Sequence, residues 1–135
     1  VTRECFFEGI KYAKEGNHLF DISSAIGRYA SERGYGVVRD LCGHGIGTNL
    51  HESPEIPNYE QGRKGVLLKE GMTLAIEPMI NAGTWEVEWL DDDWTVVTKD
   101  HSLSAHYENT VLITKGEPVL LSLSGYGERK KDGQI

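Results

Sequence analysis

The chain has 135 residues, of which 39% are hydrophobic, so it has the length of one ordinary domain and can bury a core. It carries 21 acidic and 14 basic residues, and the net charge of −7 argues against a nucleic-acid backbone as the main partner. No apolar run approaches the roughly 18 residues of a membrane span and the first residues lack a signal-peptide pattern, so neither a membrane partner nor secretion is expected.

Two helices are expected in the first third of the chain. Apolar residues recur at helical spacing over about residues 2–15, and Gly16 follows as a stop signal. In the second helix, Asp21 is expected to cap a segment with the same period, and Gly34 is placed to adopt the left-handed conformation that ends a helix. We interpret both helices as scaffold.

Strands and loops are expected in the rest of the chain. A short strand at residues 36–39 leads into a glycine-rich segment, and residues 53–64 are expected to form an irregular loop because they contain Pro54, Pro57 and Gly62. Further strands are expected at residues 72–77, 84–90, 94–98 and 107–114, the middle two forming a hairpin around three aspartates. The order of helices and antiparallel strands predicts an α+β domain over residues 1–123, followed by a polar tail over residues 124–135.

The glycine-rich segment at residues 42–47 is the most informative part of the chain about the chemistry of the protein. His44 and His51 flank glycines that let a backbone approach something small, such as a metal ion or a reacting carbonyl. His51 and Glu52 look like the start of a zinc-protease HExxH helix, but position 55 is Glu55 and Pro54 would break such a helix. That motif is therefore excluded.

The cysteines indicate the compartment. Cys5 and Cys42 lie far apart and form no CxxC motif, which is typical of a reducing compartment, so a cytoplasmic location is expected.

Two glutamates stand in sequence surroundings that predict burial. Glu77 lies between Ile76 and Pro78, and Glu108 lies among the apolar residues of the last strand. A buried carboxylate without a partner is costly. A divalent cation would compensate the charge, and His44 would complete a mixed nitrogen and oxygen site. Taken singly, each residue also fits an exposed strand face, a salt-bridged edge or an ordinary core histidine, so spacing alone leaves the site a hypothesis.

Four motifs occur in order along the chain, namely CGHGIG at residues 42–47, HE at 51–52, GMTLAIEPM at 71–79 and SAHYENT at 104–110. Together with the residues after the hairpin turn, they resemble the bacterial type of methionine aminopeptidase, a member of the pita-bread fold family. The resemblance extends to about Leu123. It implies the C-terminal half of the pita-bread catalytic domain, in which two helices pack on a curved antiparallel sheet.

The resemblance also implies a metal centre. His44 and Glu77 match ligands of one of two clustered divalent ions, and Glu108 matches the carboxylate that bridges both ions. His51 matches a histidine that hydrogen-bonds the carbonyl of the scissile peptide or neighbouring backbone. In such a site Glu77 would relay a proton, and the ions could be cobalt, manganese, iron or zinc.

Other positions bear on the substrate pocket or depart from the family pattern. Trp94 matches an aromatic near the pocket for the N-terminal methionine, and Leu50 stands where phenylalanine is common. Cys42 lies near that pocket by analogy, or is a small buried thiol that packs beside the sheet. His106 stands where glutamine is common and Asn109 where histidine is common. With His101 and Glu108, His106 could give a different metal geometry.

The implied activity is removal of the N-terminal methionine from nascent proteins and peptides. The family's catalytic domain has two pseudo-symmetric halves, and its two aspartate ligands belong to the half that precedes position 1 of this sequence. We therefore expect one weak ion site, little or no peptidase activity from this chain, and association with a complementary N-terminal half or with itself through an exposed sheet edge.

Two other functions fit the same residues. A related proline-directed aminopeptidase or dipeptidase shares the histidine and glutamate pattern but usually differs around the glycine-rich segment. A pita-bread scaffold that has lost catalysis and binds protein partners is the other alternative, although such a module has no need of the ligands.

Overall fold

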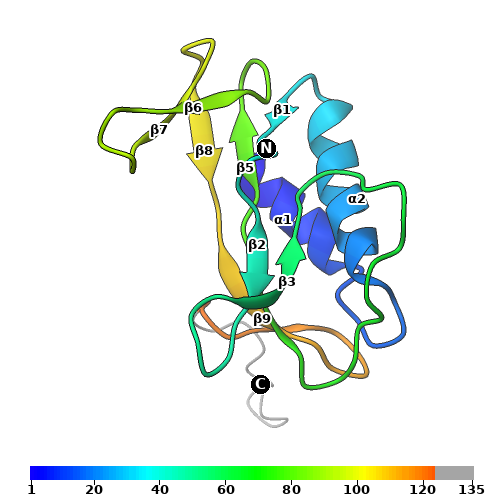
Figure 1. The fold of residues 1–135 in the computed structure, drawn as a ribbon. Coiled ribbons are helices and arrows are strands. Elements are labelled where there is room, and N and C mark those ends of the chain that lie inside the picture. Colours follow the sequence, from blue (N-terminus) through cyan, green and yellow to red (C-terminus); the bar gives the residue numbers. More distant parts are fainter. Residues whose placement is uncertain (124–135) are drawn as a thin grey trace, which may run out of the picture.

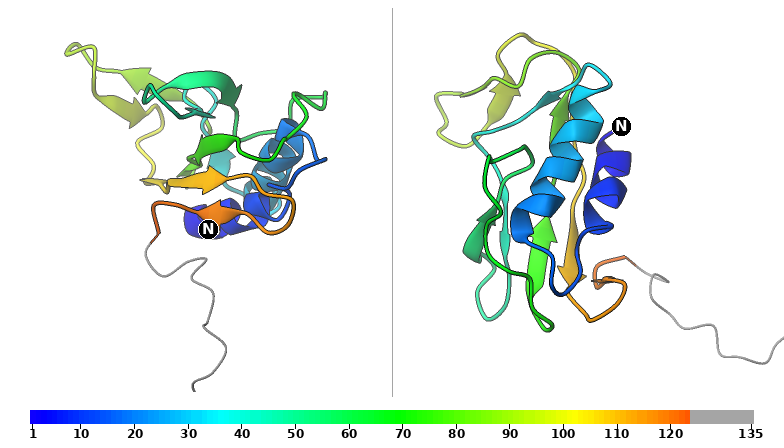
Figure 2. Two further views of the ribbon diagram at one scale, coloured as in Figure 1. Left: turned by 90° about the horizontal axis from the view of Figure 1, so that it is seen from below. Right: turned by 90° about the vertical axis from the view of Figure 1, so that its right-hand side faces the viewer.

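The structure is a computed structural model that describes residues 1–123, and the polar tail predicted at residues 124–135 lies outside the described residues. The described part forms two helices and antiparallel sheets, so the predicted α+β class is confirmed. Figure 1 shows the two helices side by side, next to the strands, and Figure 2 shows both helices on one side of the strands.

Helix α1 spans Thr2–Ile10 and is shorter than predicted. The prediction that it continues to residue 15 is wrong, because the backbone beyond its last turn bonds to other segments. The Glu15 amide donates a hydrogen bond to the Thr114 carbonyl, and the Gly16 amide donates one to the Leu68 carbonyl. These tertiary bonds satisfy the backbone groups that a longer helix would have used.

Helix α2 spans Leu19–Ser31 and begins before the predicted cap. His18 is the N-cap, and Asp21 lies within the first turn, where its carboxylate accepts a hydrogen bond of 2.8 Å from the His18 amide. The prediction of Asp21 as the cap residue is therefore wrong, although its side chain still stabilises the helix start through a capping box. Gly34 has a φ of +79°, the left-handed conformation predicted for it.

The strands are short and all pair antiparallel. Their bounds are β1 (Gly36–Val37), β2 (Gly43–Gly45), β3 (Glu52–Ile56), β4 (Thr73–Ile76), β5 (Met79–Asn81), β6 (Val87–Trp89), β7 (Val96–Thr98), β8 (Ser104–His106), β9 (Asn109–Leu112) and β10 (Val119–Leu120). A five-stranded sheet has the order β10-β9-β4-β2-β3, a three-stranded sheet has the order β1-β5-β8, and β6 pairs with β7. The predicted hairpin is confirmed as the β6–β7 pair.

The two larger sheets are linked by two chain segments, each of which contributes one strand to each sheet. Strand β4 pairs with β9 in one sheet, and their continuations β5 and β8 pair in the other. Pairing stops at Ile76–Asn109 and resumes at Met79–His106. Pro78 lacks an N–H group and so cannot donate in this gap, but its carbonyl accepts a hydrogen bond from the Tyr107 amide. The chain therefore bends at residues 77–78 and 107–108 without losing register.

One predicted loop is partly a strand. Residues 53–64 are predicted to be irregular, but strand β3 covers Glu52–Ile56. The prediction is wrong there because β3 is the edge strand of its sheet, and an edge position tolerates Pro54, whose missing N–H group leaves no partner unpaired.

The hydrophobic core lies between the helices and the five-stranded sheet. Phe6, Ile22 and Ile26 come from the helices, and Leu74 and Val111 come from β4 and β9; all five are fully or almost fully buried. This packing fixes the sheet bend relative to the helices. Among the described residues, no helix is long and apolar enough to cross a membrane.

Candidate metal centre

Glu77 and Glu108 lie at the same bend between the two larger sheets. Each follows or precedes a paired strand end, so the register that joins β4 to β9 brings the two carboxylates together although they are far apart in sequence. His44, in the middle of β2, is opposite Ala75 of β4. One ligand atom each from His44, Glu77 and Glu108 lie within 4.8 Å of one another. The three residues predicted to form a metal site therefore meet around one point.

The Glu77 carboxylate lies between two imidazoles. Its Oε1 is 3.2 Å from Nε2 of His44, and its Oε2 is 3.3 Å from Nε2 of His106. Its side chain is 14% exposed, so it is largely but not fully buried. Burial raises the pKa of the Glu77 carboxyl, the nearby Glu108 carboxylate raises it further, and His44 and His106 act in the opposite direction. The negative charge of Glu77 and Glu108 is thus incompletely compensated by the protein.

His44 is held in one orientation by its own strand. Its Nδ1 is 2.9 Å from the Gly45 carbonyl oxygen. Because a carbonyl only accepts, Nδ1 donates in this contact, and Nε2 is the ring nitrogen that faces Glu77. The neighbouring glycines let β2 fit between two strands, since a Cβ added at Gly45 would overlap the Ser53 carbonyl and one at Gly43 would overlap the Ala75 carbonyl. The glycine-rich motif thus sets the orientation of the His44 ring.

Glu108 differs from its prediction. Its side chain is 45% exposed, so the expectation of burial is wrong. The reason is the alternation of side chains around the bend, where the Tyr107 ring turns into the core and lies 5.3 Å from the Phe6 ring, so that the next residue points away from it. That outward direction takes Glu108 toward Glu77.

The donor set fits a divalent ion. An imidazole nitrogen and two carboxylates are ligands that zinc, manganese, cobalt and iron accept, and a cation would relieve the excess negative charge at Glu77. The spacing of 3.2 Å between His44 Nε2 and Glu77 Oε1 matches that of two neighbouring ligands on one ion, which lie about 3 Å apart when each bond is about 2.1 Å.

Of the four residues predicted to bind substrate, two lie in a pocket beside His44 and two are exposed in a turn and a loop. The His51 ring centroid is 4.1 Å from that of His44, and both residues line a surface pocket with Cys42. Burial raises the pKa of the Cys42 thiol, with a further contribution from Glu55. Trp94 is 86% exposed in the β6–β7 turn and Leu50 is exposed in the loop before β3. Their roles in substrate binding stay predictions.

Sequence reasoning gave His106 little weight, yet its ring reaches the centre. Its Nε2 is also 3.8 Å from Oε2 of Glu108. The usable signal is its position two residues before Glu108, because alternate residues of an extended chain share a side. His101, considered with it, is in a turn with a φ of +61° and is not one of the three clustered ligand residues.

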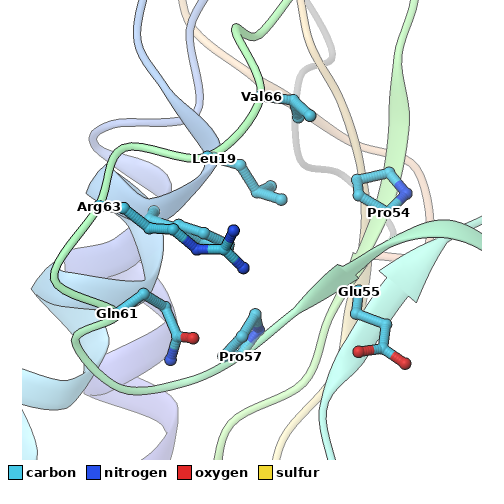
Figure 3. A pocket seen from close by; sticks show the side chains of 9 residues that line it. Leu19, Pro54, Glu55, Pro57, Gln61, Arg63 and Val66 are labelled. Atoms are coloured by element: carbon cyan, nitrogen blue, oxygen red, sulfur yellow. The ribbon is translucent and has the colours of Figure 1, made fainter.

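A separate pocket lies between α2 and β3. Figure 3 shows Leu19 and Val66 with Pro54 and Pro57 around it, and Arg63 extending across it. The Arg63 guanidinium is 5.3 Å from the centroid of the Phe20 ring. This pocket is mainly apolar and has one carboxylate, Glu55, on its wall, so it does not resemble an ion site.

Comparison with known proteins gives the family. The sequence profile of "Metallopeptidase family M24" matches residues 1–115. A methionine aminopeptidase from Clostridium acetobutylicum is 54% identical over 123 residues, which are 91% of this chain and 49% of that protein. The solved methionine aminopeptidase of Thermotoga maritima is 48% identical with a TM-score of 0.86, over 89% of this chain and 48% of that one. The solved prolidase of Pyrococcus horikoshii is 25% identical with a TM-score of 0.67, over 93% of this chain and 30% of that one.

The chain belongs to metallopeptidase family M24. The predicted resemblance to methionine aminopeptidases and to the pita-bread fold is confirmed, and the family implies a divalent metal. The chain spans about half the length of the curated relatives it matches.

Proposed function

We propose that His44, Glu77 and Glu108 bind a divalent ion and that the chain contributes this centre to a methionine aminopeptidase. The meeting of one imidazole and two carboxylates at the sheet bend is the observation that carries the proposal. The high identity to relatives named methionine aminopeptidase supports the choice of substrate, which is a peptide or nascent protein that begins with methionine.

The chemistry divides among the residues as follows. A bound divalent ion supplies Lewis-acid chemistry, because it polarises a carbonyl and lowers the pKa of water. Glu77 accepts the proton that the attacking water loses and passes it to the leaving amine, a role that suits a carboxyl whose pKa is raised by burial. His51 donates a hydrogen bond to the carbonyl oxygen of the scissile peptide as negative charge develops there. Cys42, Leu50 and Trp94 contribute to the pocket for the methionine side chain.

The 135-residue chain is proposed to bind one ion weakly and to show little or no peptidase activity. Among the described residues its cluster contains three protein ligands, of which Glu108 is 45% exposed. Isothermal titration with Zn²⁺ or Co²⁺ tests the site. The expected result is one ion per chain, with binding lost in His44→Ala and retained in His101→Asn, because His101 is exposed and asparagine tolerates its positive φ. Two tightly bound ions, or rapid hydrolysis of a methionyl peptide, would contradict this.

A partner is proposed at the free edge of the three-stranded sheet. Strand β8 is an edge strand with three exposed residues, and the Leu103 side chain beside it is exposed as well. Unpaired strand edges with apolar neighbours favour pairing with another chain. A complementary N-terminal half is the proposed partner, and a second copy is the alternative. Sedimentation of the chain alone and with a half taken from a relative distinguishes the two, and a monomer in both samples would contradict association.

We also infer a cytoplasmic location from the two free cysteines.

Two other functions are separated by assay. The solved prolidase shares the fold at lower identity, which keeps a proline-directed peptidase as the second candidate. A complex of this chain with the N-terminal half of a relative is expected to cleave Met-Gly peptides and to leave X-Pro peptides intact, whereas the reverse result would favour the prolidase activity. Cleavage of neither, together with no bound metal, would favour a scaffold that binds protein partners.

A further inference from the structure

His106 is the residue near the metal centre whose role is unexplained. It ends strand β8, opposite Met79 of β5, and its ring extends across the sheet bend. Its Nε2 lies 3.3 Å from Oε2 of Glu77 and 3.8 Å from Oε2 of Glu108. The side chain is 48% exposed, so packing alone does not account for its position.

We propose that His106 is a second nitrogen donor to the ion held by His44, Glu77 and Glu108. This inference rests on the proposed metal centre, which it extends from three protein ligands to four. The ion would then be held by two imidazoles and two carboxylates, all from this chain's own residues.

The distances support a shared ion. Two donors bound to one ion at about 2.1 Å, with an angle of about 90–130° between the bonds, lie about 3.0–3.8 Å apart. The two distances from His106 Nε2 fall within this range, as does the 3.2 Å between His44 Nε2 and Glu77 Oε1. His44 Nε2 approaches Oε1 of Glu77 and His106 Nε2 approaches Oε2, and His106 is not in the group of ligand atoms that lie within 4.8 Å of one another, so ion binding would draw its ring closer to His44.

A simple ion pair explains the geometry less well. One Nε2–H group can direct a strong hydrogen bond at only one oxygen, whereas His106 Nε2 approaches a carboxylate oxygen of both Glu77 and Glu108. The pair that His106 forms with Glu108 is about half exposed on both sides, and such pairs contribute little free energy. A lone pair on Nε2 directed at a cation between the two carboxylates accounts for both approaches.

X-ray absorption of the zinc-loaded 135-residue chain tests the proposal, because the spectrum counts imidazole ligands. We expect two imidazoles per ion in the parent chain and one in His106→Gln, which keeps a polar side chain but removes the ring nitrogen. Loss of an outer partner of a ligand weakens metal binding about 10–100-fold, so loss of a direct donor is expected to raise the Kd at least about tenfold. His101→Asn is the matched control and is expected to change neither quantity.

The outcomes separate the two proposals. If His106→Gln leaves the imidazole count and the Kd unchanged while His44→Ala abolishes binding, the role of His106 is overturned and the three-ligand centre stands. If His44→Ala also leaves binding unchanged, the centre itself is overturned. Thermal unfolding of the metal-free variants, with His106→Ala as a second substitution, separates a loss of affinity from a loss of fold. A Tm equal to that of the parent chain is expected.

Discussion

Replacement of Gly45 by alanine is expected to damage both the fold and the metal centre. Gly45 is in β2, which is paired on both sides, by β3 and by β4. An added Cβ would overlap the Ser53 carbonyl oxygen, and it would lie 2.8 Å from the Ser53 carbonyl carbon and 3.2 Å from the Glu52 oxygen. All of these are backbone atoms, so no side chain can rotate away and a strand must move.

The magnitude follows from this overlap. Overpacking of this kind costs about 1–3 kcal/mol, from a total unfolding free energy of about 5–15 kcal/mol for a domain. At about 4 °C per kcal/mol for a chain of this length, the Tm should fall by about 4–12 °C. Because the Gly45 carbonyl fixes the His44 ring, the ion affinity should also fall by about 10–100-fold.

Circular dichroism melting and calorimetric Zn²⁺ titration measure the two effects. Gly116→Ala is the matched control, since a Cβ there meets nothing within 4 Å and the φ of Gly116 is not positive. It should be neutral or stabilise the chain by up to about 1 kcal/mol. The reasoning is refuted if Gly45→Ala melts within about 1 °C of the control and binds zinc as the parent does.

Three further predictions concern charge and exposure. Glu77→Gln should raise the stability of the metal-free chain at neutral pH, because burial and Glu108 raise the pKa of Glu77 and so make its charged form costly in the folded state. The parent chain should therefore gain stability as the pH falls through that raised pKa. Chemical denaturation at several pH values measures this, and equal stability of the two chains at neutral pH would contradict it. Hydrogen bonds from Ser102 and the Thr84 amide lower the pKa of Asp100 to about 2, so Asp100→Ala should destabilise the chain at neutral pH, and the deficit should disappear as pH falls from about 3.8 to about 2. Trp94→Ala should change the unfolding free energy by less than about 0.5 kcal/mol, as measured in urea, because the ring is exposed.

Local patterns predicted the helices and several strands but not their ends. Apolar periodicity identified α1 and α2, because the buried face of a helix repeats along the chain. The end of α1 depended on amide bonds from Glu15 and Gly16 to distant carbonyls, which no local pattern records. In the same way, Pro54 indicated a loop, but its edge position in the sheet allowed a strand.

Residue types and local patterns indicated the chemistry available to this protein, since the glycine-flanked His44 and the two glutamates with apolar neighbours indicated a divalent-ion site, and the ordered motifs indicated the family. Which of these groups meet depends on the three-dimensional fold. The register of the strand pairs at the bend places Glu77 beside Glu108, exposes Glu108, and brings the ring of His106 to the centre. Ligand geometry depends on the pairing of strands distant in sequence, whereas residue type and spacing report only the local chain.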